Sequence, residues 1–369
     1  MGAQNRYIIF ISLCAFILNQ VVEFIILWSN GHGYDALCIF DCRWYSSIVM
    51  DGYALVPSGH EKGDAANWAF FPLSPLVATG VRYLTGVTGD LALIISSRIF
   101  FLLSICAFVK FCLIYSPRVS IIVCALVAAY QPYAIYGNVG YTEPMFLLGT
   151  CLSLICMKQR RYVLAGIFGG ALSAVRAVGV ALCLSYAVFF AKDVLTKPGD
   201  RYRIILGAML LPLGLSFYML FLHFWMGDAL AFSHIQRAWH RQMQNPFSVL
   251  WNNLYFHPQM MSYYFSILIC IISIFYNVMV GRAELAVFLL FCMFIPLSTG
   301  IDSMSRYIWW QAPVLLAASE FVSFSIFRIS SLSNGKKWLW VGASVIFSMM
   351  TAVQFFMVLS WVAVREYMI

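Results

Sequence analysis

Long apolar stretches separated by short polar segments dominate the chain. A helix needs about 20 mostly apolar residues to cross a bilayer. The stretches that approach this length are residues 7–28, 90–115, 119–136, 141–157, 204–226, 260–281, 283–300, 306–327 and 338–362. This pattern predicts an all-α polytopic membrane protein.

The apolar stretch 162–191 is too short for two full-length spans and too long for one. Basic clusters flank it on both sides, at Lys158–Arg161 and Lys192–Arg203. Because basic residues favour the cytoplasmic side of a membrane, both ends are expected on that side. We therefore expect a tight hairpin of two short helices with its apex near Arg176. The predicted total is about 11 membrane helices.

Charges separate well if the N-terminus lies in the cytoplasm and the spans alternate. The cytoplasmic connections are then short and basic, and two long segments, 29–89 and 227–259, lie outside. Within the first of these, Phe40–Met50 and Leu73–Leu84 have apolar residues at helical spacing, which predicts amphipathic helices on the membrane surface. We expect one domain over residues 1–369, with the two external segments covering an active site.

Composition agrees with a membrane protein and excludes two other kinds of site. Hydrophobic residues make up 62% of the chain and charged residues 10%, against about 45–50% and about 25% in soluble domains. The net charge is +8, but the basic residues are spread thinly between apolar runs, so no nucleic-acid partner is expected. The 11 cysteines include no CxxC and no zinc spacing. No disulfide is expected between Cys38 and Cys42, because this spacing on a regular helix would strain one.

The first external segment contains FDCRWYSSIVMDGY, residues 40–53. Asp41 is a candidate general base for a sugar hydroxyl, with Arg43, Trp44 and Tyr45 as candidate substrate-binding residues beside it. An aromatic ring there can stack on a sugar. A second interpretation remains open, in which Asp41 caps the surface helix and the aromatic side chains form an interfacial belt.

Two charged residues stand in apolar surroundings further along the chain. Glu143, in YTEP at 141–144, suits the start of a helix after the N-cap residue Thr142, but it also puts a carboxylate at the outer membrane boundary. Arg176 is a lone cation, and burying it is costly without a partner. It therefore needs an acid such as Glu143 or Asp41, or an anionic ligand such as a phosphate.

The second external segment contains HFWMGDALAFSHIQRAWHRQ, residues 223–242. Asp228 opens an expected helix, on which Phe232, Gln236, Trp239 and His240 recur at helical spacing, a pattern that usually indicates packing. No acidic ligand stands at a matching spacing from the histidines, so we expect no metal site.

Arg306 stands at the outer mouth of an expected span, in IDSMSRYIWWQAP at 301–313. A guanidinium there can hold a lipid phosphate through two hydrogen bonds. It can equally be an interfacial arginine that reaches from the helix to the surface.

Several of these motifs occur in one order over nearly the whole chain: FDCRWY with DGY, AFFPLSP, YTEPMFLL, VRAVG, GDALAFSHIQRAW and SRYIWWQAP. In this the sequence resembles the PIG-V family, which belongs to the GT-C class of membrane glycosyltransferases. The resemblance implies Asp41 as the candidate catalytic base. It further implies a cavity lined by Glu143, Arg176, Asp228, Gln236, Trp239, Arg306 and Tyr307.

The resemblance also implies inverting transfer of a hexose, with mannose expected. The donor would be a polyprenyl-phosphate-linked sugar and the acceptor a hydroxyl of a lipid-linked or cell-envelope glycan. No cofactor and no metal is expected, the other partners are membrane lipids, and a small partner subunit stays open. The expected place is a bacterial plasma membrane with a periplasmic active site, or the ER membrane in a eukaryote. The alternatives are a lipid-glycan transporter or flippase, and a non-catalytic subunit of a glycosylation complex.

Overall fold

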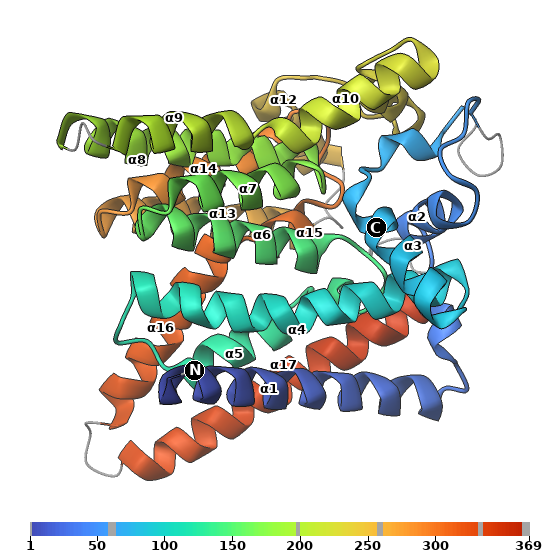
Figure 1. Ribbon diagram of the computed structural model, residues 1–369. Coiled ribbons are helices and arrows are strands. Elements are labelled where there is room, and N and C mark those ends of the chain that lie inside the picture. The colour runs from blue at the N-terminus through green and yellow to red at the C-terminus, as the bar shows by residue number, and fades with distance from the viewer. Residues whose placement is uncertain (1, 58–63, 197–199, 257–260, 331–334, 364–369) are drawn as a thin grey trace.

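The computed structural model describes residues 2–57, 64–196, 200–256, 261–330 and 335–363, and within them every regular element is a helix (Figure 1). The helices, with η marking 3-10 turns, are α1 (Ala3–Ser29), η1 (Tyr34–Leu37), α2 (Asp41–Asp51), η2 (Asn67–Ala69), α3 (Leu73–Thr85), α4 (Gly89–Tyr115), α5 (Ile121–Tyr130), η3 (Ala134–Gly137), α6 (Glu143–Lys158), α7 (Tyr162–Ser173), η4 (Ala177–Ala181), α8 (Leu182–Thr196), α9 (Arg201–Leu210), α10 (Leu213–Met226), α11 (Ala231–His234), η6 (Ile235–Trp239), α12 (Pro246–Phe256), α13 (Met261–Met279), α14 (Ala283–Leu297), α15 (Met304–Trp309), α16 (Ala312–Ser330) and α17 (Gly335–Val362).

Four helices in the described part of the chain are long and apolar enough to cross a membrane: α1, α4, α13 and α16. A fifth span results if the bent pair α9 and α10 counts as one. Shorter apolar helices, among them α5, α7 and α14, coincide with expected membrane helices but fall short of the length a bilayer requires. The chain is therefore an integral membrane protein of helices, and the total of about 11 spans stays a prediction.

Prolines divide three of the expected spans. The stretch 119–136 is helical only as far as Tyr130, two residues before Pro132, and 204–226 bends by 41° between α9 and α10, next to Pro212. The stretch 306–327 is split into α15 and α16 beside Pro313. Proline lacks an amide hydrogen and disfavours helical geometry in the residue before it, so the helix is interrupted within each of these three expected spans.

The predicted hairpin over 162–191 is correct in its break and wrong in its packing. The chain leaves α7 just before Arg176 and enters η4 and α8 just after it. However, α7 packs against α6 and α9, whereas α8 packs chiefly against α14. Glycines allow the close packing of α7 on α9. A Cβ at Gly166 of α7 would overlap the backbone of α9, and a Cβ at Gly207 of α9 would overlap the backbone of α7.

The two helices of the first long segment, 29–89, lie together at one end of the molecule. Both expected amphipathic helices of the first long segment are present as α2 and α3, which pack on each other and on α4 (Figure 1). Residues 58–63 and 257–259 of the two expected external segments lie outside the described part. The position of α2 and α3 at a membrane surface stays a prediction.

Cys38 and Cys42 form a disulfide, which corrects the expectation of free thiols. The expectation assumed that both residues lie on one regular helix. Instead α2 begins only at Asp41, and Phe40 before it has a φ of 52°, so the chain turns sharply between the two cysteines. Their Cα atoms are 5.1 Å apart, within the normal range for a disulfide.

Candidate active site

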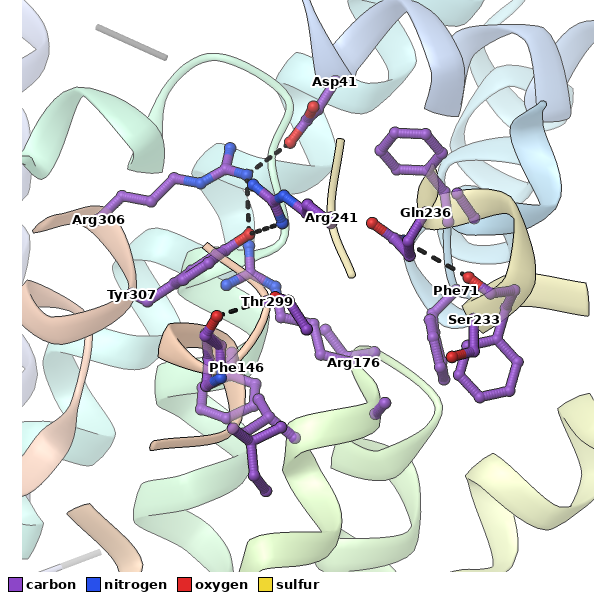
Figure 2. A pocket seen from close by; sticks show the side chains of 18 of the residues that line it. Asp41, Phe71, Phe146, Arg176, Ser233, Gln236, Arg241, Thr299, Arg306 and Tyr307 are labelled. Atoms are coloured by element: carbon purple, nitrogen blue, oxygen red, sulfur yellow. Dashed lines mark hydrogen bonds and ion pairs between the residues drawn. The ribbon is translucent and has the colours of Figure 1, made fainter. Parts of the chain in front are cut away.

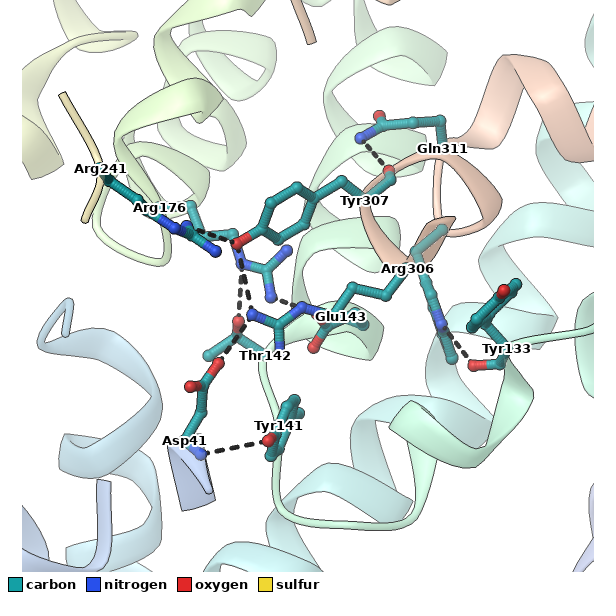
Figure 3. Close-up of polar contacts among 11 residues, drawn as sticks. Asp41, Tyr133, Tyr141, Thr142, Glu143, Arg176, Arg241, Arg306, Tyr307 and Gln311 are labelled. Carbon is teal, nitrogen blue, oxygen red and sulfur yellow. Dashed lines mark hydrogen bonds and ion pairs between the residues drawn. The ribbon is translucent and has the colours of Figure 1, made fainter. Parts of the chain in front are cut away.

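Five of the sequence-predicted residues converge in space although they come from distant parts of the chain (Figure 3). Asp41 is the first residue of α2, and Glu143 is the first residue of α6. Arg176 lies between α7 and η4, while Arg306 and Tyr307 are neighbours on α15. Two helix starts, a short connection and the short helix α15 thus hold the five residues at one end of the bundle.

Asp41 forms an ion pair with Arg306. The Nη2 atom of Arg306 donates a hydrogen bond to Oδ2 of Asp41 at 2.7 Å, and the backbone amide of Asp41 donates to the hydroxyl of Tyr141 at 3.1 Å. The N-cap position of α2 is Phe40, without a side-chain cap. The interpretation of Asp41 as a helix cap is therefore wrong. Its side chain is 28% exposed, so the carboxylate stays accessible while one oxygen is held in place.

Glu143 is fully buried and bridges two arginines. Nη2 of Arg176 donates to Oε1 of Glu143, and Nε of Arg176 donates to the hydroxyl of Thr142 at 2.8 Å. Nε of Arg306 lies 3.5 Å from the same carboxylate oxygen. Of the partners left open for Arg176, the structure has the acid Glu143. Glu143 itself lies behind the pocket wall rather than lining it, and it holds the guanidiniums in position.

Tyr307 accepts hydrogen bonds from two arginines at once. Nη2 of Arg306 and Nη1 of Arg241 each lie 3.3 Å from its hydroxyl oxygen, and the guanidinium of Arg176 lies 5.1 Å from the ring centroid. Tyr307 belongs to α15, outside the span that begins at Ala312. Burial raises the pKa of this hydroxyl, but the guanidiniums of Arg241, Arg306 and Arg176 together lower it to about 7.

Sequence reasoning missed Arg241. Arg241 follows Arg237 on the same external segment, and no spacing distinguishes one from the other. In the structure Arg237 is exposed, whereas Arg241 lines the pocket and contacts Tyr307. Only the fold distinguishes these two arginines, because it brings Arg241, and not Arg237, to Tyr307 on α15.

A pocket of about 270 Å³ opens beside this cluster (Figure 2). One part of its wall is polar and the facing part carries Gln236 and aromatic rings, so both long segments, 29–89 and 227–259, contribute to it. The principal lining residues are Asp41, Tyr45, Phe70, Phe71, Phe146, Arg176, Phe232, Gln236, Trp239, Arg241, Arg306 and Tyr307.

The aromatic part of the wall is built by rings that pack on one another. Trp44 stacks on Phe70 with ring centroids 6.0 Å apart, and Trp239 meets the edge of Trp44 at 5.7 Å. Tyr45 packs edge to face on Phe70 at 5.0 Å. Tyr45 and Trp239 line the pocket, whereas Trp44 supports them from behind.

Besides Trp44 and Glu143, which lie behind its wall, two of the expected residues lie outside the pocket. Arg43 is exposed on α2 and is not part of the lining. Asp228 is 43% exposed, accepts from the amide of Leu230 at 2.9 Å, and pairs with His234 at 2.7 Å. The hydrogen bond from His234 lowers the pKa of Asp228. The expectation that Asp228 lines the cavity is therefore wrong, because its carboxylate is used to start the segment around α11.

The cluster carries more positive than negative charge. Three guanidiniums, those of Arg176, Arg241 and Arg306, face two carboxylates, those of Asp41 and Glu143. Buried charge needs compensation, so this arrangement is suited to hold an anion. No three His, Cys, Asp or Glu side chains gather as a metal site in the described ranges, and the expectation of no metal stays a prediction.

No protein-family model matches the sequence, and no curated protein sequence matches it. The fold is similar to that of the oligosaccharyltransferase of Archaeoglobus fulgidus, with a TM-score of 0.56, 12% identity, and coverage of 94% of this chain and 52% of that one. It is also similar to ArnT from Cupriavidus metallidurans, solved with undecaprenyl phosphate, with a TM-score of 0.53, 13% identity, and coverage of 91% and 63%. These are membrane glycosyltransferases of the GT-C type.

The chain therefore has the GT-C fold, over about half to two thirds of the length of those two proteins. This likeness confirms the expected GT-C-type helical fold, and the fold alone. The resemblance to the PIG-V family is not confirmed by these comparisons and stays a prediction.

Proposed function

We propose that this protein is an inverting membrane glycosyltransferase. It would move a hexose from a polyprenyl-phosphate-linked donor to a hydroxyl group of a lipid-linked or cell-envelope glycan. The observation that carries the proposal is the convergence of Asp41 with the guanidiniums of Arg176, Arg241 and Arg306 on one pocket. Two further observations support it: the GT-C fold, and the undecaprenyl phosphate bound by ArnT, which has the same fold.

Asp41 is the proposed general base. Its Oδ2 is held by Arg306 at 2.7 Å, and the carboxylate borders the pocket. An acceptor hydroxyl beside the carboxylate gives its proton to Asp41 as its oxygen attacks the anomeric carbon. The bond from that carbon to the phosphate oxygen breaks in the same displacement, so the anomeric configuration inverts and no enzyme nucleophile is needed. A non-catalytic subunit would not need a carboxylate aimed into the cavity.

The leaving group is a polyprenyl phosphate, and its charge is what the arginines would stabilise. The sequence offered Arg306 as a guanidinium that can hold a lipid phosphate, but it is already paired with Asp41 and lies close to Glu143. Arg176 is likewise paired with Glu143. Arg241, whose hydrogen bond is to a tyrosine hydroxyl, has the guanidinium most available to a phosphate.

The hexose would occupy the aromatic part of the pocket. Flat apolar faces such as those of Phe70 and Trp239 suit the C–H face of a sugar ring, while Gln236 offers a hydrogen-bonding amide. The pocket volume of about 270 Å³ admits one hexose, while the prenyl chain of the donor would remain among apolar helices. Mannose is the proposed hexose on the strength of the PIG-V resemblance alone.

The Cys38–Cys42 disulfide supports an active site on the non-cytoplasmic side. Asp41 lies between the two cysteines in sequence, so the disulfide and the pocket are at the same end of the molecule. Disulfides persist in oxidising compartments such as the periplasm or the ER lumen, and they are rare in the cytosol. The disulfide thus agrees with the orientation expected from the basic connections.

The test is a donor panel. The purified full chain in lipid nanodiscs is incubated with polyprenyl phosphates carrying mannose, glucose, galactose or N-acetylglucosamine, together with a glycolipid extract as the source of acceptors. Mass analysis follows donor loss and product mass. We expect loss of the mannosyl donor and a product one hexose heavier. If no donor is consumed by folded protein, the transferase proposal is wrong.

A further inference from the structure

We propose that Tyr307 couples donor binding to the uptake of a proton: its phenolate neutralises the arginine cluster in the empty pocket, and its protonated hydroxyl donates to the donor phosphate once that anion arrives. This inference rests on the proposed function, because it assumes a ligand with a phosphodiester group. It adds a role for Tyr307 that the proposed function does not assign.

The hydrogen-bond geometry supports this role. The hydroxyl oxygen of Tyr307 lies 3.3 Å from Nη1 of Arg241 and 3.3 Å from Nη2 of Arg306 (Figure 3). Arginine nitrogens can only donate, so the oxygen accepts from both sides at once. Such an arrangement favours the ionised form of a phenol, since the anion accepts charge-assisted hydrogen bonds more strongly than the neutral hydroxyl.

The charge count points the same way. Arg306 is paired with Asp41, and Arg176 is paired with Glu143. The third cation, Arg241, has the Tyr307 oxygen as its hydrogen-bond partner. If Tyr307 were neutral, this largely buried cluster would hold one uncompensated positive charge, which is unfavourable. A phenolate makes the cluster neutral when no ligand is bound.

The titration behaviour of Tyr307 agrees with this geometry. Burial and the nearby carboxylate of Asp41 raise the pKa of Tyr307. The guanidiniums of Arg241, Arg306 and Arg176 outweigh both and lower this pKa to about 7. The pocket wall has a second tyrosine, Tyr45, whose pKa is raised, with burial as the largest cause. Tyr45 is thus a matched control that stays protonated near neutral pH.

When the donor binds, its phosphodiester replaces the Tyr307 phenolate as the anion that accepts hydrogen bonds from the arginines. The donor carries one negative charge, which the arginines then bind, and this added charge favours protonation of Tyr307. The proton comes from solvent and stays on the Tyr307 oxygen, which turns from acceptor to donor toward a phosphate oxygen. One proton is therefore taken up for each donor bound above the pKa of the free site, and none well below it.

The test uses a short-chain mannosyl phosphoprenol, whose phosphodiester keeps one charge across the pH range. Its binding to the full chain in nanodiscs is measured by calorimetry from pH 6 to pH 9, in buffers of different ionisation enthalpy. For a group with a pKa of about 7, linkage predicts a Kd about tenfold higher at pH 8 than at pH 6, and again about tenfold higher at pH 9. The ultraviolet absorbance of tyrosinate should fall on binding at pH 8.

The Tyr307→Phe variant should bind with a Kd that barely changes between pH 6 and pH 9. At pH 9 it should bind more tightly than the wild type, because it has no phenolate to displace, whereas a merely lost contact would weaken binding at every pH. Tyr45→Phe should keep the pH dependence and the absorbance change. The wild-type titration decides the question by itself if Tyr307→Phe does not fold.

The outcomes separate the two proposals. Donor binding with proton uptake and the expected pH dependence supports the role of Tyr307. Donor binding with a constant Kd and no proton uptake overturns that role and leaves the proposed function intact. Absence of donor binding to folded wild-type protein at every pH overturns the proposed function, and the inference with it.

Discussion

Replacing Asp41 with asparagine tests the candidate base directly. Asparagine has nearly the same shape, and its side-chain oxygen can still accept the hydrogen bond that Arg306 donates to Oδ2 at 2.7 Å. What the variant loses is the negative charge and the ability to take a proton. Removal of a general base lowers a rate by roughly a hundredfold to ten-thousandfold. A thousandfold loss corresponds to about 4 kcal/mol of transition-state stabilisation.

The same change should alter stability much less than activity. Arg306 keeps a hydrogen bond that its own charge assists but loses the ionised acceptor, a difference of about 1 kcal/mol. Glu143 remains 3.5 Å from Nε of Arg306, so this cation keeps a carboxylate nearby. A variant that folds normally and fails to transfer sugar is therefore the expected result.

The assay is single-turnover transfer from saturating donor, followed by mass analysis, with thermal unfolding measured on the same preparations. Asp51→Asn is the matched control, because Asp51 ends the same helix, is exposed, and lies outside the pocket lining. We expect Asp51→Asn to transfer at the wild-type rate. Wild-type turnover by Asp41→Asn would refute the assignment of the base, and an equal loss in Asp51→Asn would show that the assay reports on α2 rather than on the carboxylate.

Three further predictions address donor binding, the disulfide and helix packing. Arg241→Gln should raise the donor Kd by about ten- to a hundredfold, the loss expected for a hydrogen bond to a charged group; an unchanged donor titration would exclude it from the phosphate site. Peptide mapping without reductant should find Cys38 linked to Cys42, and replacing both with serine should lower the free energy of unfolding by roughly 2 kcal/mol; maleimide labelling of both thiols in untreated protein would contradict the link. Gly207→Ala should lower the free energy of unfolding by about 1–3 kcal/mol, because its Cβ would overlap the backbone of α7. Gly80→Ala, where nothing lies within 4 Å of the added atom, should not destabilise; equal melting shifts in the two glycine variants would refute the close approach.

Most of the charged members of the site could be found without the structure. Asp41, Glu143, Arg176 and Arg306 stand in apolar surroundings, where a charge is costly unless it is used or paired. Which of them pair was not decidable, because an ion pair depends on distances between residues far apart in sequence. Arg176 had Glu143, Asp41 and an anionic ligand as open partners, and the packing of α7 against α6 selected Glu143.

The errors have the same origin. Asp228 belongs to the motif that also contains Gln236 and Trp239, yet its side chain turns outward to His234. Arg241 was passed over as an ordinary external cation, yet the fold returns it to Tyr307. Sequence spacing along a short irregular segment does not define which side chains face inward, because α11 and η6 together complete too few turns to set a stable face.

The order of apolar and polar residues by itself determined that this is a helical membrane protein with two long polar segments at one end. Local chemistry is enough for that, since lipid admits only segments whose backbone groups bond within themselves, and the length of an apolar run can be read directly. Only the tertiary structure decided that helices α2 and α15 bring Asp41 and Arg306 to a common pocket, with Glu143 of α6 buried behind its wall. It also decided that the spans break at prolines and that a disulfide lies beside the site, because these depend on how packed helices place atoms in three dimensions.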